Sequence, residues 1–101
     1  IRTLSGRISL FSTETRRRRM RYRGHSGRIT SLQFFDGGRE FVSASADGTV
    51  RLWNRRKSRA RQTFGSAGTK VANAVVSPDG RMIATGKDNG TVQIWSGVVL
   101  D

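Results

Sequence analysis

The residues best suited to acid–base chemistry in this chain are its single histidine, His25, and the later Ser43 and Asp47. A serine, a histidine and an aspartate could form a nucleophilic triad, in which the imidazole takes the hydroxyl proton and the carboxylate orients the ring. However, the sequence pairs no acids and places no phosphate-binding glycine loop before a helix, and it contains no cysteine to bind zinc. We therefore expect no catalytic residue, metal ligand or cofactor, and we interpret His25 as structural.

Arginine is the other chemically distinctive residue. The 101 residues include nineteen Lys and Arg, sixteen of them Arg, against seven Asp and Glu, and the formal net charge is +12. Such a balance favours an acidic partner, either nucleic acid or an acidic protein surface. The apolar runs are far too short to cross a bilayer, so no membrane partner is expected.

The elements that carry these residues repeat with a period of 42 residues. Gly6, Gly48 and Gly90 coincide when the chain is shifted by one period, and the aromatic residues Phe11, Trp53 and Trp95 coincide as well. A period of this length is typical of repeat architectures. The chain holds only about 2.4 such periods.

Each period reads as short strands joined by tight turns. In residues 49–53, Val50 and Leu52 alternate with Thr49, Arg51 and Trp53 after an Asp-Gly turn, which predicts a half-buried strand. Residues 29–34 and 41–45 form the two strands before it, and no window keeps helical spacing. The arginine-rich residues 16–23 and 55–64 keep some alternation and are predicted to be fourth strands. Four strands per period predict the blade of a β-propeller.

The motif residues resemble a known family. Gly24, His25 and residues 43–54 resemble a WD repeat, with Asn54 replacing the final aspartate; residues 87–95 resemble it too, and residues 5–12 are similar to the tail of a degenerate repeat. The resemblance implies an all-β fold of four-stranded antiparallel propeller blades in an incomplete ring. We expect residues 1–23 to end a degenerate blade, 24–65 to form a complete repeat, and 66–101 to form a repeat that lacks its outer strand.

In this family, one His, one Ser or Thr, one Asp and one Trp of a repeat form a buried hydrogen-bonded tetrad. The resemblance implies that His25, Ser43, Asp47 and Trp53 play these parts here, with Ser45 as the alternative hydroxyl. The third copy keeps only Thr85 and Trp95, because Ser66 and Ala67 stand at its Gly-His position. We expect packing without the full network there.

Two surfaces are candidates for binding. WD-repeat proteins often dock peptides on the top face of the ring, and the resemblance places six residues there: Arg28, Thr30, Ala46, Lys70, Ala72 and Asp88. The other candidate is a stripe of basic side chains on the two outer strands, expected to lie side by side: Arg16, Arg17, Arg18, Arg19, Arg21, Arg23, Arg55, Arg56, Lys57, Arg59 and Arg61. Ordinary solvated loops and a solubilising edge are the respective alternatives.

The resulting expectation is a non-catalytic scaffold that docks proteins within a multi-subunit assembly, inside the cell, in the cytoplasm or else in the nucleus, cytoskeleton or cilium. The alternatives are a ribonucleoprotein subunit that uses the arginine stripe on RNA phosphates, and a binder of an acidic, tubulin-like surface. Since a propeller buries its blades against one another, we expect neighbouring blades from a longer chain, or else from further copies in a homo-oligomeric ring.

Overall fold

The computed structural model describes residues 6–65 and 68–96. Expectations for residues 1–5, 66–67 and 97–101, including Ser66 and Ala67, lie outside this part. The described residues are all-β apart from one short 3-10 helix, η1 (Asp36–Gly38), which connects the strands predicted at residues 29–34 and 41–45. None of the described helical structure is long or apolar enough to cross a membrane.

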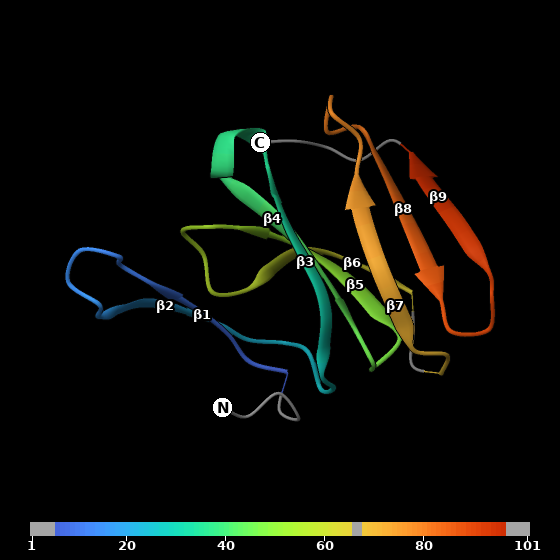
Figure 1. Ribbon diagram of the computed structural model, residues 1–101, viewed down its shortest axis with the longest axis horizontal. Helices are drawn as coiled ribbons and strands as arrows, with labels where there is room; N and C mark the ends of the chain where they lie inside the picture. The colour runs from blue at the N-terminus through green and yellow to red at the C-terminus, as the bar shows by residue number, and fades with distance from the viewer. Residues whose placement is uncertain (1–5, 66–67, 97–101) are drawn as a thin grey trace.

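Nine strands of the described part form three separate antiparallel sheets (Figure 1). The first sheet has two strands, the second four and the third three, in chain order within each sheet. Their bounds are β1 (Ile8–Phe11) and β2 (Arg18–Tyr22); β3 (Ile29–Phe35), β4 (Glu40–Ser45), β5 (Thr49–Asn54) and β6 (Ala60–Gly65); and β7 (Val71–Val76), β8 (Met82–Lys87) and β9 (Val92–Ser96). The predicted fold class is confirmed: the sheets have the form of propeller blades, and over the described residues they do not close a ring.

The 42-residue period is visible in the backbone. Gly6, Gly48 and Gly90 all adopt positive φ, at 63°, 91° and 87°, a conformation that glycine reaches without the steric cost of a Cβ atom. The pairing of β3 with β4 shifts register between Ile29 and Ser31, and the pairing of β7 with β8 shifts at the equivalent place. Equivalent residues therefore hold equivalent backbone conformations.

The middle sheet is packed on both faces. Every residue of β4 is buried. One core cluster joins the first and middle sheets through Ile8, Tyr22, Phe41 and Trp53. A second cluster joins the middle and third sheets and consists of Val42, Ala44, Val50, Leu52, Val71, Ala74, Val76 and Ile83. The predicted alternation is confirmed, since Val50 and Leu52 face one neighbour and Trp53 the other.

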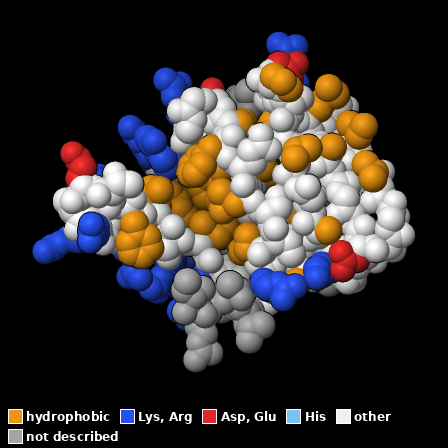
Figure 2. All heavy atoms as spheres, in the orientation of Figure 1, with side chains coloured by type: hydrophobic (Ala, Val, Ile, Leu, Met, Phe, Trp, Pro, Cys, Tyr) orange, Lys and Arg blue, Asp and Glu red, His pale blue; other side chains and the backbone are white. Residues whose placement is uncertain are grey.

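Apolar side chains remain exposed where a sheet lacks a neighbour. On the third sheet, Val75, Val92 and Ile94 expose 48%, 69% and 71% of their surface. On β3, Leu32 and Phe34 are also exposed, beside a first sheet of only two strands. Figure 2 shows hydrophobic side chains gathered between the β1–β2 hairpin and the rest of the molecule. These faces are the bare ends expected of an incomplete ring.

The fourth strand of the middle sheet is shorter than predicted. It begins at Ala60, so Arg55, Arg56, Lys57 and Arg59 lie in the turn before it rather than on the outer strand. The side chain of Asn54 accepts the backbone N–H of Arg56 at 2.9 Å, and its carbonyl accepts that of Lys57 at 3.0 Å. These bonds close a turn, which the alternation of apolar residues did not reveal.

Candidate functional site

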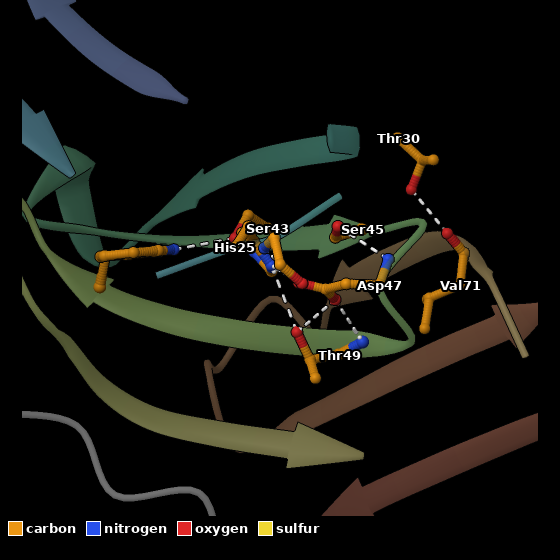
Figure 3. A network of polar contacts seen from close by, with 9 residues as sticks. His25, Thr30, Ser43, Ser45, Asp47, Thr49 and Val71 are labelled. Atoms are coloured by element: carbon orange, nitrogen blue, oxygen red, sulfur yellow. Dashed lines mark hydrogen bonds and ion pairs between the residues drawn. The ribbon is translucent and has the colours of Figure 1, made fainter. Parts of the chain in front are cut away.

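A chain of hydrogen bonds crosses the middle sheet from Trp53 to Asp47, and Figure 3 shows its part from Ser43 through His25 to Asp47. The indole N–H of Trp53 donates to Ser43 Oγ at 2.8 Å, and Ser43 Oγ lies 2.6 Å from His25 Nε2. His25 Nδ1 lies 3.0 Å from Asp47 Oδ2. The four residues named by the WD-repeat resemblance therefore contact one another in series. Ser43 lies on β4 and Trp53 on β5, Asp47 lies in the turn between these strands, and His25 lies in the loop before β3.

Asp47 holds the turn between β4 and β5. It accepts both the side-chain O–H of Thr49 at 2.6 Å and the backbone N–H of Thr49 at 2.8 Å, and it accepts the N–H of Ser26 at 3.0 Å. Burial by itself would raise the pKa of Asp47, but the hydrogen bonds from Thr49, His25 and Ser26 lower it to about 2. The carboxylate is thus ionised and its oxygens are occupied.

His25 and Ser43 are buried, with 6% and 0% of their surface exposed, so the hydrogen bond between them lies inside the fold rather than on its surface. Burial lowers the pKa of His25, although the hydrogen bond and charge of Asp47 oppose that effect, so the ring is neutral at pH 7. A neutral imidazole donates from one nitrogen and accepts at the other, which matches Nδ1–H donating to Asp47 and Nε2 accepting from Ser43. Among residues 6–65 and 68–96, no three His, Cys, Asp or Glu side chains are grouped so as to hold a metal.

Ser45, the alternative hydroxyl, and the tetrad positions of the third repeat make fewer hydrogen bonds than the chain from Trp53 to Asp47. Ser45 is fully buried, but its Oγ accepts only the N–H of Asp47, at 3.1 Å, and is not hydrogen-bonded to His25. In the third sheet, the indole of Trp95 donates to Thr85 Oγ1 at 3.2 Å. The Trp-to-hydroxyl bond is thus present in both repeats, while the longer chain of bonds occurs in the middle sheet.

The six top-face residues lie together at one end of the middle and third sheets. The N–H of Ala46 donates to the carbonyl of Arg28 at 2.8 Å. One period later, the N–H of Asp88 donates to the carbonyl of Lys70 at 3.1 Å. In both sheets, the start of the inner strand is therefore tied to the next hairpin turn. We call the surface formed by the six top-face residues the rim.

The rim residues differ in how far they are already engaged. Thr30 Oγ1 donates to the carbonyl of Val71 at 2.6 Å, so this hydroxyl joins the two inner strands (Figure 3). Lys70 Nζ lies 3.6 Å from Asp88 Oδ2, in a pair that stays partly exposed. Arg28 and Ala72 are exposed. Arg28, Lys70, Ala72 and Asp88 are thus the rim residues that a partner could reach.

The two segments of the basic stripe contact each other at one point, whereas one arginine of the stripe points away from the others. The backbones of Arg23 and Arg59 form a parallel bridge, with the N–H of Arg23 donating to the carbonyl of Ser58 at 3.0 Å. In contrast, Arg61 turns into the sheet, where its Nε donates to the buried carboxylate of Glu40 at 2.6 Å. Arg61 is therefore held by an acid on β4, although no acid lies near it in the sequence.

Repulsion within the stripe is evident at Arg21. Its pKa is lowered, first by the charge of Arg18, then by burial and by the charges of Arg7 and Arg23. Like charges on neighbouring strands are unfavourable, and an anion between them would relieve the repulsion.

Sequence reasoning missed several residues that hold the sheets together. Thr49 contacts both Asp47 and His25, and its place directly after the Asp-Gly turn could have indicated this. Ser31 and Gln33 bond the backbone of β7, at Ala74 and Val76. No local pattern identifies these two, because their partners lie 43 residues away.

Comparison with known proteins agrees with this architecture. The chain matches the family described as "WD domain, G-beta repeat" over residues 16–54 and 59–96. One similar protein is the U3 small nucleolar RNA-associated protein 21 homolog of Schizosaccharomyces pombe, which is 45% identical over 46% of this chain and 5% of its own length. Another is the target of rapamycin complex 1 subunit mip1 of Schizosaccharomyces pombe, which is 34% identical over 54% of this chain and 4% of its own length. A guanine nucleotide-binding protein subunit beta of Oryza sativa is 42% identical over 43% of this chain and 11% of its own length.

The chain thus spans only a small part of each relative. Two family matches cover most of the described residues, and each contains one of the two Trp-to-hydroxyl bonds. Each match starts one strand before its sheet, with β2 in the first match and β6 in the second. On these grounds the chain belongs to the WD domain, G-beta repeat family.

Proposed function

We propose that this chain is a non-catalytic interaction scaffold that docks proteins through its rim, within an intracellular multi-subunit assembly. The observation that carries the proposal is the hydrogen bond that ties the start of each inner strand to its hairpin turn. It holds Arg28, Lys70 and Asp88 just beyond the strand ends, and Ala72 on β7 beside them. Binding residues on loops that a rigid scaffold positions are a common arrangement for recognition. The burial of His25 and Ser43 supports the non-catalytic part, because a substrate would have to reach them.

The relatives support the same direction. One is named as a subunit of the target of rapamycin complex 1, and another as a guanine nucleotide-binding protein subunit. In this proposal, neighbouring blades cover the exposed face of the third sheet at Val92 and Ile94, and they belong either to a longer chain or to further copies.

The test is site-specific photo-crosslinking from the rim. A photoreactive residue at Ala72 should capture a defined partner, and Lys70→Glu should abolish the capture. The matched control places the same group at Arg81, which is exposed in the turn between β7 and β8, at the other end of the sheet. Equal capture of the same protein from Arg81 would contradict docking at the rim.

RNA binding by the basic stripe is the second candidate function. The Arg23–Arg59 bridge favours it, because it joins the two arginine-rich segments. One relative is named as a small nucleolar RNA-associated protein. Contact with about six phosphates of single-stranded RNA would give a slope of about −4 in a plot of log binding constant against log salt concentration. Replacing Arg16, Arg17, Arg18 and Arg19 with serine should flatten that slope, and binding that survives about 0.5 M salt would argue against phosphate contacts. An acidic, tubulin-like protein surface would be recognised by the same charges.

A further inference from the structure

A groove of about 660 Å³ separates the β1–β2 hairpin from the turn that follows β5. Three apolar residues of the hairpin line it, together with three arginines: Leu10, Phe11, Met20, Arg19, Arg55 and Arg56. A second hollow of about 340 Å³ shares Arg55 and Arg56 and extends to Arg39 and Asn54. Because Arg55 and Arg56 line both hollows, the two are continuous. Together they place an apolar surface next to four arginines: Arg19, Arg39, Arg55 and Arg56.

The residues that line the groove are complementary to a ligand that is both apolar and negatively charged. Phe11 leaves 57% of its surface exposed, although it stands at the position where the other repeats have a packed tryptophan. Among the described residues that line the two hollows, none is acidic. Guanidinium groups bind carboxylates in a planar, two-pronged geometry, and they do so more strongly where water is partly excluded. The apolar side would thus receive a side chain of the ligand while the arginines receive its carboxylates.

The arginine side of the groove is held in place by the fold. The N–H of Arg55 donates to the carbonyl of Arg39 at 2.8 Å, and the N–H of Arg56 donates to Asn54 Oδ1 at 2.9 Å. The hydroxyl of Tyr22, a buried residue of β2, donates to the carbonyl of Arg55. The backbone that carries Arg39, Arg55 and Arg56 is therefore fixed before any ligand arrives, which lowers the entropic cost of binding.

We propose that this groove binds an acidic peptide segment that carries one large aliphatic or aromatic side chain. The apolar residues seat that side chain, and Arg19, Arg39, Arg55 and Arg56 pair with the flanking carboxylates. A peptide fits better than a nucleic acid, because Phe11 is the one aromatic ring among the described residues that line the groove, and one ring offers no ladder on which successive bases could stack.

The groove is separate from the rim. Strand β5 begins at the hairpin turn of the rim and ends at Asn54, beside the groove, so the two surfaces lie at opposite ends of the sheet. The proposal therefore goes beyond docking at the rim, and either surface could bind if the other did not.

The test measures the full chain against a fluorescent peptide with three glutamates around one leucine. We expect saturable binding at moderate salt, and we expect Arg56→Ser to weaken the affinity about tenfold, the size of one charge-assisted contact. Phe11→Ser should weaken it by a similar factor. Arg81→Ser removes the same charge from an exposed turn of the third sheet and should leave the affinity unchanged. Since Phe11 and Arg56 are exposed, both variants should keep the wild-type thermal unfolding.

Several outcomes would overturn the proposal. If a peptide with serine in place of leucine binds equally well, the apolar side of the groove plays no part. If Arg81→Ser weakens binding as much as Arg56→Ser, only the overall charge matters. Tighter binding of a single-stranded RNA oligomer of equal charge, with the same loss on Arg56→Ser, would assign the groove to nucleic acid. If no partner is crosslinked from Ala72 but the peptide still binds, docking at the rim is contradicted and peptide binding in the groove is not.

Discussion

Replacing Ser43 with alanine tests whether the hydrogen-bonded chain stabilises the middle sheet. Ser43 Oγ is fully buried, and it accepts from Trp53 at 2.8 Å while lying 2.6 Å from His25 Nε2. Removal of the hydroxyl leaves the indole N–H and the imidazole nitrogen without their partner. No other hydrogen bond to either atom is present among the described contacts. The substitution therefore disrupts two buried polar groups while removing a single oxygen atom.

The expected magnitude follows from those two groups. A buried donor or acceptor that loses its partner costs about 1–3 kcal/mol, so the free energy of unfolding should fall by about 3 kcal/mol. Ser45→Ala is the matched control, because Ser45 is equally buried two residues further along β4 and its Oγ accepts one backbone N–H, at 3.1 Å. That control should cost about 1 kcal/mol.

The assay is urea unfolding of the full chain followed by circular dichroism. Trp53→Phe removes the indole donor, so combining it with Ser43→Ala should cost less than the sum of the two separate losses. If Ser43→Ala costs no more than Ser45→Ala, or if the two changes at Ser43 and Trp53 simply add, the hydrogen-bonded chain does not stabilise the sheet.

Three further predictions concern other contacts. Glu40→Ala should lower the unfolding free energy by about 3 kcal/mol, because Arg61 then loses the buried carboxylate that it contacts at 2.6 Å; urea unfolding checks this. Thr30→Val should cost about 1 kcal/mol, since its hydroxyl donates to the carbonyl of Val71 across two sheets, and thermal unfolding measures it. Acid should also destabilise the fold, because the pKa of Asp47 is about 2 in the folded chain against an ordinary 3.8. The ionised carboxylate thus contributes about 2 kcal/mol to the free energy of unfolding above about pH 4, and this contribution is lost as the pH falls toward about 2. Urea unfolding at several pH values measures the loss, and Asp47→Asn should remove that part of the pH dependence.

Much of the fold follows from spacing within the chain. The recurrence of Gly6, Gly48 and Gly90 predicts turns with positive φ, and all three adopt it. The alternation around Val50 and Leu52 predicts which face they share. These features depend on residues close in sequence, where the pleat and the turn geometry dictate side-chain direction.

The surfaces could not be predicted in the same way. The segment 55–59 looked like part of a strand, because its arginines mask the turn that Asn54 closes. Arg61 was expected to face an anionic partner, yet it contacts Glu40, two strands away in the sheet. The sequence carries no local sign of this pair, since the two residues are brought together only by stacking β4, β5 and β6.

The repeat, the all-β class and the residues of the Trp53-to-Asp47 chain can all be recognised from the order of residues in the chain. The packing of the sheets fixes which charges remain available and where apolar and basic side chains meet. Strand pairing sets Arg61 against Glu40, and sheet packing brings Phe11 of the hairpin to the same groove as Arg55 and Arg56. The physical reason is that periodicity specifies strands and their faces, whereas a groove depends on how two sheets pack at a distance in sequence.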